Sequence, residues 1–261
     1  MPYIGEFLGT MLLILLGDGV VANVLLNRSG FKGAGPVQIT FAWGLAVLLP
    51  VCIFGASSGA HFNPALTIAF AVGGMFPWSM VFGYCVAQMA GAFCGAVLMW
   101  LLFADHFDAT EDPLLKRACF CTSPSIPNRP RNFLSEIVGT FVLIFAILGL
   151  SQVNGMVGAQ GNILVFCIIV SIGMSLGGLT GYAINPARDL GPRLAHWILP
   201  MKNKADSNWG YGVVTLFGPI IGALIGMGLF KIIPWAPLTF YVRLSRKTKP
   251  PWLSEGALFM G

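Results

Sequence analysis

Two identical tripeptides are the residues of this chain best suited to bind a passing solute. Asn63-Pro64-Ala65 recurs as Asn185-Pro186-Ala187, and each copy lies in a Gly-rich, apolar stretch. An Asn followed by Pro favours a helix start, because the Asn side-chain oxygen caps the first turn and Pro at the first helical position lacks an N–H that would be unpaired. The amide NH2 of each Asn then faces outward beside a positive dipole end. The pair indicates a duplicated donor device for hydroxylated solutes crossing a membrane.

The composition is that of a polytopic membrane protein. Of the 261 residues, 56% are hydrophobic and only 10% are charged, against about 25% charged in soluble domains. The net charge of +5 comes largely from the basic C-terminal tail and needs no nucleic-acid partner. Six long apolar stretches, most near the ~20 residues that cross hydrocarbon, predict six spans with both termini on one side. They lie at about 3–26, 37–54, 78–104, 133–150, 161–178 and 211–235.

The two halves of the chain resemble each other beyond the tripeptide. GEFLGT at 5–10 opens the first span, and SEIVGT at 135–140 opens the fourth. Three spans per half is an odd number, so the second half must enter the membrane in the opposite orientation, as an inverted repeat. Within one channel domain, 1–261, we expect a first repeat, an exposed external linker with several prolines, a second repeat and a polar basic tail. Their ranges are 3–104, 105–132, 133–235 and 236–261.

The repeated tripeptides lie outside the six spans. Helices of about 10 residues from Pro64 and about 12 from Pro186 would each be too short to cross, but together they match one bilayer of about 30 Å. We therefore expect two re-entrant half-helices that meet start to start near the midplane. Irregular backbone at that depth is tolerated only where it lines a cavity, so the segments 57–62 and 180–184 should turn their carbonyls toward a pore.

A few charged residues fall inside the apolar stretches. Glu6 and Glu136 occupy matching places, where a carboxylate at a helix centre costs about 2.5–3.5 kcal/mol, and we expect internal partners for both; the alternative is a membrane-surface Glu near a helix start. Arg188 lies on a first helical turn, where a cation opposes the dipole, and this indicates a function. Arg193 fits a snorkelling surface arginine better. Asp18 is interpreted as facing water and is assigned no role.

The chain carries no pattern typical of an enzyme. It has no nucleotide loop, metal cluster or catalytic triad, so we expect neither a cofactor nor a bound metal. Cys119 and Cys121 form a lone C-x-C that would close a very strained disulfide, and they are interpreted as free thiols. The other four cysteines fall in spans, where they serve as small hydrophobic residues: Cys52, Cys85, Cys94 and Cys167.

The sequence SGAHFNPA at 58–65 and the sequence GYAINPARD at 181–189 resemble the two signatures of the major intrinsic protein family, the aquaporins, and specifically its glycerol facilitator branch. The resemblance covers the chain from Gly5 to about Trp235. It implies an all-α, aquaporin-like right-handed bundle in the cell (plasma) membrane, assembled as a homotetramer with one pore per subunit. Counting Lys and Arg in the connections leaves the orientation open, whereas the resemblance implies cytoplasmic termini.

The resemblance also implies a selectivity filter made of Trp43, Gly173, Tyr182 and Arg188. In this set Arg188 would donate hydrogen bonds to the solute hydroxyls, and the faces of Trp43 and Tyr182 would contact its carbon backbone. Gly173, which has no side chain, would keep the constriction wide. A water-only channel of the family typically has His at the Gly173 position and a smaller residue at the Tyr182 position, so glycerol conduction is favoured. The known glycerol facilitators carry Phe where this chain has Tyr182, which leaves the relative water and glycerol rates open.

The remaining roles follow from the same resemblance. Asn63 and Asn185 are the central donors, and their facing helix dipoles repel cations and interrupt a proton wire. Glu6 and Glu136 brace the two half-loops, and Asp189 organises the outer loop. The carbonyls that face the solute belong to Gly59, Ala60, His61, Phe62, Tyr182, Ala183 and Ile184.

These observations predict a passive channel for glycerol, other small uncharged solutes and water, which excludes protons and ions and contacts only lipid, its solutes and further copies of itself. Two alternatives remain within transport. One is a predominantly water-selective aquaporin, and the other is a proton-coupled small-solute transporter that uses Glu6, Glu136 or Asp18 as a relay. A third alternative is a structural membrane junction protein with a closed pore.

Overall fold

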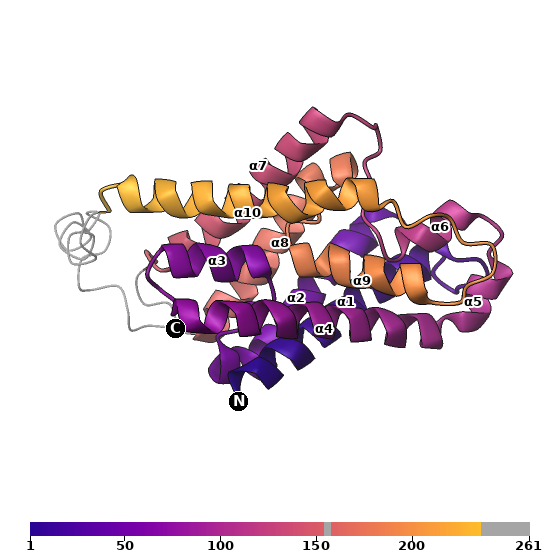
Figure 1. Ribbon diagram of the computed structural model, residues 1–261, viewed down its shortest axis with the longest axis horizontal. Helices are drawn as coiled ribbons and strands as arrows, with labels where there is room; N and C mark the ends of the chain where they lie inside the picture. Colours follow the sequence, from indigo (N-terminus) through magenta and orange to yellow (C-terminus); the bar gives the residue numbers. More distant parts are fainter. Residues whose placement is uncertain (154–157, 236–261) are drawn as a thin grey trace, which may run out of the picture.

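The computed structural model describes residues 1–153 and 158–235, and these form a bundle of helices (Figure 1). Six helices are long and apolar enough to cross a membrane, which confirms the six predicted spans. The basic tail, at 236–261, lies outside the described residues. The six helices are α1 (Pro2–Leu25), α2 (Pro36–Ser58), α4 (Trp78–Leu102), α7 (Arg129–Leu150), α8 (Gly158–Thr180) and α10 (Trp209–Ile232).

Two shorter helices begin at the repeated tripeptides. α3 (Pro64–Val72) has 9 residues and α9 (Pro186–Ile198) has 13, close to the expected lengths. At 1.5 Å per residue they measure about 14 and 20 Å, so neither crosses hydrocarbon alone. Figure 1 shows α3 and α9 following one another along the long axis between α4 and α10, and each contacts both of those helices. The two half-helices thus form one composite span.

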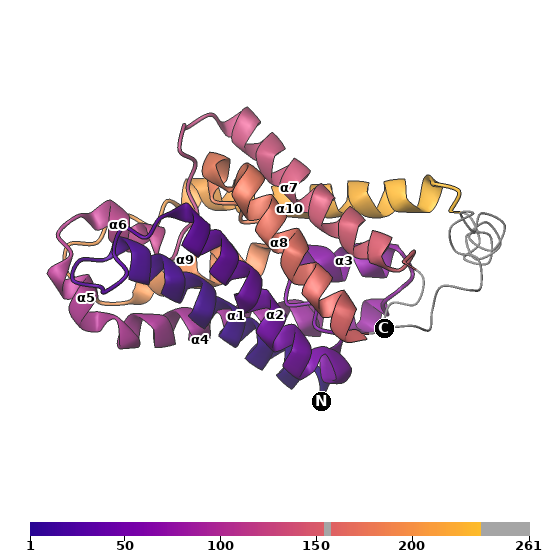
Figure 2. The same cartoon turned by 180° about the vertical axis from the view of Figure 1, so that it is seen from behind.

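The two repeats pack in the same way. α4 packs on α1 in the first repeat and α10 packs on α7 in the second, while Figure 2 shows α2 and α8 side by side. Glycine makes the close helix contacts possible: a Cβ at Gly91 would lie 2.2 Å from the Phe7 carbonyl oxygen, and one at Gly222 would lie 2.1 Å from that of Ile137. The small residues spaced four apart in these helices therefore serve packing within the chain.

The linker differs from the exposed loop that its prolines predict. It contains two short helices, α5 (Ala104–Ala109) and α6 (Pro113–Ala118), and the segment 119–122 that follows them is buried. The Phe120 ring packs 5.5 Å from the His196 ring of α9, measured between centroids. The longest exposed stretch of the linker is 125–131. The expectation was wrong for the buried part because an apolar Phe and two cysteines offset the loop signals of the prolines.

All six cysteines lie in the described residues and are free thiols. Cys119 and Cys121 are buried in the linker, and burial raises the pKa of the Cys121 thiol to about 12.

Candidate functional site

The two segments that precede the half-helices have the same unusual backbone. Residues with a positive φ recur in the same order in both repeats, and four of the six are not glycine. The left-handed region costs a non-Gly residue roughly 1–2 kcal/mol, so this conformation must be held by its surroundings. The residues are Gly59 (81°), Ala60 (52°) and Phe62 (48°) in the first repeat, and Gly181 (78°), Tyr182 (36°) and Ile184 (43°) in the second.

In the first repeat a fully buried carboxylate holds this backbone. The Oε1 atom of Glu6 accepts hydrogen bonds from the His61 N–H (3.0 Å) and the Ser58 hydroxyl (2.8 Å). Its Oε2 atom accepts from the Phe62 N–H and the Gln88 amide, both at 2.7 Å. Four donors thus compensate the buried charge and fix the loop amides on the side of α1.

Glu136 repeats this arrangement in the second half. It is also fully buried, and it accepts hydrogen bonds from the N–H groups of Ala183 (3.0 Å) and Ile184 (2.8 Å) and from the Thr180 hydroxyl (2.7 Å). Both carboxylates therefore have internal partners, and neither is a membrane-surface Glu. The sequence repeat at 5–10 and 135–140 corresponds to a structural repeat in which one acid braces one loop.

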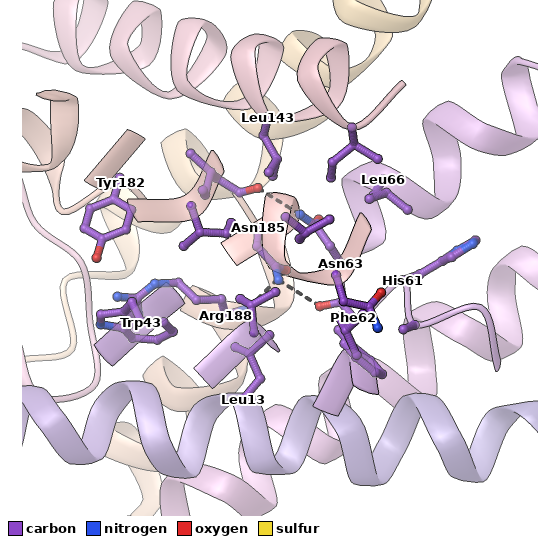
Figure 3. Close-up of a pocket in the computed structure, with 18 of the residues that line it drawn as sticks. Leu13, Trp43, His61, Phe62, Asn63, Leu66, Leu143, Tyr182, Asn185 and Arg188 are labelled. Carbon is purple, nitrogen blue, oxygen red and sulfur yellow. Dashed lines mark hydrogen bonds between the residues drawn. The ribbon is translucent and has the colours of Figure 1, made fainter. Parts of the chain in front are cut away.

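The two half-helix asparagines bind the opposite repeat as well as their own helix. Each side-chain oxygen accepts from the backbone N–H two residues further on, at 2.9 Å. The Asn63 amide donates to the Ile184 carbonyl (2.9 Å), and the Asn185 amide donates to the Phe62 carbonyl (2.8 Å), as the dashed lines in Figure 3 show. The expectation that the whole NH2 group faces outward is therefore only half met, because one N–H of each amide is taken and one remains for a solute.

A cavity of about 230 Å³ runs past both asparagines. Its polar lining comes from the loops and half-helix starts, and it includes all seven residues whose carbonyls were expected to face a solute. Its apolar lining comes mainly from the spanning helices α1, α2, α7 and α8. The apolar residues are Leu13, Val47, Val51, Leu66, Phe70, Leu143, Ile147, Val165 and Ile169. The cavity is amphipathic along its length.

Three of the four residues expected in a filter meet at one end of this cavity. Figure 3 shows Trp43, Tyr182 and Arg188 together at that end, with the asparagines in the middle and His61 toward the other end. The Arg188 guanidinium carbon lies 4.0 Å from the centroid of the Trp43 ring, a cation–π contact. Among the described residues, the Trp43 indole N–H and the Tyr182 hydroxyl have no hydrogen-bond partner. The protein thus leaves both groups unpaired at this end.

Gly173 lies behind the filter and does not line the cavity. A Cβ at this position would lie 3.0 Å from the Tyr182 Cζ and 3.0 Å from the Thr40 Cγ2. Gly177, one helical turn further along, would bring a Cβ to 2.7 Å from the Tyr182 ring. Both glycines therefore make room for that ring. The sequence analysis missed Gly177, although it follows Gly173 by four residues, a spacing at which small residues allow close packing.

Within the described residues, the group formed by Trp43, Tyr182 and Arg188 is not repeated at the other end of the cavity. The positions of the opposite repeat that match Trp43, Tyr182 and Arg188 also line the cavity, but they carry smaller, apolar residues: Val165, Ala60 and Leu66. The donors at the centre are thus duplicated, whereas the combination of one arginine with Trp43 and Tyr182 is not.

A fully buried ion pair lies on α9, directly after Arg188 in the sequence. Arg193 is fully buried and its Nε donates to the Asp189 Oδ2 at 2.8 Å, so the interpretation of Arg193 as a snorkelling surface residue was wrong. Asp189 also accepts from the Thr122 N–H (2.9 Å) and the Thr215 hydroxyl (2.7 Å). It thereby joins the linker, α9 and α10, and it is not among the residues that line the cavity.

Asp18 is a functional candidate to which the sequence analysis assigned no role in a passive channel. It is 1% exposed and does not face water; its Oδ1 lies 3.5 Å from the Arg188 Nη1. The available signal was its charge, because an ionisable residue inside a span is functional by default. Its partner could not be read from the sequence, since the two residues are far apart along the chain.

These features define a multi-pass membrane channel. It has six spans in an inverted repeat, two half-helices that meet at their capped starts, and an amphipathic cavity. The chain belongs to the major intrinsic protein family, whose sequence model matches residues 2–230. This confirms the resemblance inferred from the two signatures, and the family is one of membrane channels, not of enzymes.

Relatives and a solved structure agree with this assignment. The chain is similar to the probable glycerol uptake facilitator protein of Thermotoga maritima, with 52% identity over 229 residues, 88% of this chain and 97% of the relative. It is 48% identical to glycerol uptake facilitator protein 3 of Lactiplantibacillus plantarum over 231 residues, 88% and 96% of the two chains. The crystal structure of the aquaglyceroporin from Plasmodium falciparum superposes with a TM-score of 0.79 at 30% identity, covering 88% of this chain and 95% of that one.

Proposed function

We propose that this chain is a passive channel that conducts glycerol and other small uncharged solutes, with water as a secondary permeant, and excludes protons and ions. The observation that carries the proposal is the end of the cavity where a guanidinium, two aromatic rings and two unpaired polar atoms meet. A polyol has hydroxyls on a short carbon backbone, and this end offers both donors and apolar ring surface. The glycerol facilitators among its relatives support the same substrate class.

The rest of the cavity is suited to the same kind of solute. Hydroxyls would pass from the proposed filter of Trp43, Tyr182 and Arg188, with Gly173 behind it, to the loop carbonyls and then to the asparagines. The carbon backbone would meanwhile contact the apolar wall. Because each hydroxyl finds a partner, the solute sheds its water without a large desolvation cost.

Exclusion of protons and ions would rest on the centre of the cavity. Asn63 and Asn185 each retain one N–H, and each lies at a half-helix start that carries roughly half a positive charge. A passing oxygen accepts from both donors, which turns its own hydrogens outward and interrupts a proton wire. Glu6 and Glu136 act as braces in this proposal, because their oxygens are occupied by backbone donors and neither lines the cavity.

The organisation of the chain follows from these roles. We assign 3–104 and 133–235 to the two repeats of one channel domain, and 105–132 to an external linker that Asp189 holds over the filter. In the plasma membrane both termini would lie in the cytoplasm, so that the filter faces outward. We further propose a homotetramer with one pore per subunit, surrounded by lipid, and large exposed apolar side chains on the helix surfaces, such as Phe82 and Leu102, support both contacts.

Flux measurements on purified protein in liposomes test this function. Stopped-flow light scattering in glycerol and sorbitol gradients should show accelerated glycerol influx relative to empty vesicles. Absence of that acceleration would refute the proposal. Faster water flux without glycerol flux would indicate a water-selective aquaporin instead, and a proton flux under an imposed gradient would favour a proton-coupled transporter.

A further inference from the structure

Asp18 places a carboxylate inside an apolar spanning helix, directly against the filter arginine. Its side chain is 1% exposed, its Oδ1 lies 3.5 Å from the Arg188 Nη1, and its Oδ2 has no hydrogen-bond partner among the described residues. Asp18 does not line the cavity, whereas Arg188 does. The carboxylate therefore contacts the filter from behind.

Two other carboxylates toward this end already have a cationic partner. Asp189 is balanced by Arg193 at 2.8 Å, with both residues fully buried. Further out, Arg117 pairs with Asp206 at 3.2 Å on the surface. In the part of the chain that the structure describes, Asp18 is the one carboxylate that forms an ion pair with Arg188.

The filter arginine is held weakly by the protein. Within residues 1–153 and 158–235, its guanidinium makes the contact with Asp18 and the contact with the Trp43 ring, and no hydrogen bond from the guanidinium to the protein is present. Its remaining N–H groups are therefore free for solutes, and Asp18 is the group that opposes its charge. A charge left unbalanced at a narrow, water-poor site attracts ions of the opposite sign strongly.

We propose that Asp18 is a positioning residue and the counter-charge of Arg188, and that it keeps the filter electrically neutral so that neither anions nor cations are attracted to it. This inference rests on the proposed function, because it assigns a further determinant to the same filter. It predicts which ions each variant conducts: loss of the Asp18 carboxylate should admit anions, and loss of the Arg188 guanidinium should admit cations.

The test uses proteoliposomes that contain more potassium nitrate inside than outside, with a voltage-sensitive dye to report the membrane potential. Nitrate leak makes the interior positive and potassium leak makes it negative. Wild type should develop no potential. Asp18→Asn, which keeps the shape of the side chain, should raise nitrate permeability by about tenfold or more. Arg188→Val should give a potential of the opposite sign, and the double variant should give neither.

Asp206→Asn is the matched control, because it removes one negative charge from a side chain that is 82% exposed and pairs away from the filter. It should behave as wild type. Nitrate permeability that stays at the wild-type level in folded Asp18→Asn would overturn the proposal, since the carboxyl would then carry no charge that the pore senses. If Asp18→Asn fails to fold, Arg188→Val alone decides: a leak that favours nitrate, or no leak, would overturn the proposal.

Glycerol influx measured in the same vesicles tests the proposed function separately from the role of Asp18. A wild type without glycerol flux would refute the proposed function. Variants that conduct glycerol but show no change in ion preference would refute only the role of Asp18.

Discussion

Gly173→Ala offers a test of the filter that depends on packing and leaves the chemistry of the cavity lining unchanged. The added Cβ would lie 3.0 Å from the Tyr182 Cζ, and ordinary van der Waals contact begins at 3.4 Å, so the ring must move by a few tenths of an ångström. On the other side Thr40 is equally close, at 3.0 Å, and offers no free space. The Tyr182 ring should therefore move toward the cavity and narrow the filter.

The magnitude follows from the cost of overpacking. If about 1–2 kcal/mol of the usual 1–3 kcal/mol penalty for an added methyl group appears in the barrier for the larger solute, glycerol flux falls about 5- to 30-fold. Water is narrower and should be slowed much less. Ala is favoured over Gly in a helix by about 1 kcal/mol, so the protein should still fold.

The assay is stopped-flow light scattering, with glycerol and water permeabilities measured on the same vesicles. Gly178→Ala is the matched control in α8, because a Cβ there meets nothing within 4 Å. Gly173→Ala should also be tested in a Tyr182→Ala background, where its effect should disappear. A glycerol-to-water ratio that Gly173→Ala leaves unchanged, or an equal fall in the Tyr182→Ala background, would refute the reasoning.

Three further predictions concern other parts of the site. Tyr182→Phe removes a hydroxyl that has no protein partner and leaves a smaller, less polar ring, which suits the carbon backbone of glycerol better than it suits water, so the glycerol-to-water flux ratio should rise about two- to tenfold; an unchanged ratio would mean that this hydroxyl does not face the solute. Glu136→Gln leaves one loop N–H without an acceptor, which costs about 1–3 kcal/mol. This variant should therefore unfold at a lower temperature in detergent than Asp108→Asn, which changes an exposed acid and serves as the control. Equal unfolding temperatures would contradict the bracing role. Burial raises the pKa of Cys121 to about 12, so the reactive thiolate forms only as the pH rises toward that value. At pH 8 a charged methanethiosulfonate should therefore label Cys121 far more slowly than a cysteine introduced by Ser125→Cys in the exposed stretch of the same linker. Equal labelling rates would show that the segment around Cys121 is not buried.

Local signals were sufficient for the fold. Hydropathy identified the six spans, and an Asn followed by Pro marked both half-helix starts, because capping depends on neighbouring residues only. The same local reading placed Glu6 and Glu136 in matching positions, since each opens a repeat. These features needed no knowledge of which helices touch.

Contacts between distant segments were not accessible in this way. Asp18 lies on α1 and Arg188 on α9, so neither hydropathy nor spacing could pair them. Arg193 was interpreted as a surface residue because it lies further along the half-helix than Arg188, and the sequence did not reveal that Asp189 pairs with it in the interior. Gly173 was assigned to the filter by resemblance, and only the structure shows that it packs behind the Tyr182 ring.

The asymmetry of the cavity has a physical rationale under the proposed function. A solute that passes barriers in series is selected by the highest one, so a single narrow filter is enough to discriminate among neutral solutes. A second filter would add resistance and little selectivity, and the matching positions at the other end carry Val165, Ala60 and Leu66. Proton exclusion is different, because a proton wire must be interrupted where the field is positive from both sides. That requirement is met at the centre only if each repeat contributes one donor and one helix start. The asparagine is therefore present in both repeats, whereas the filter is present in one.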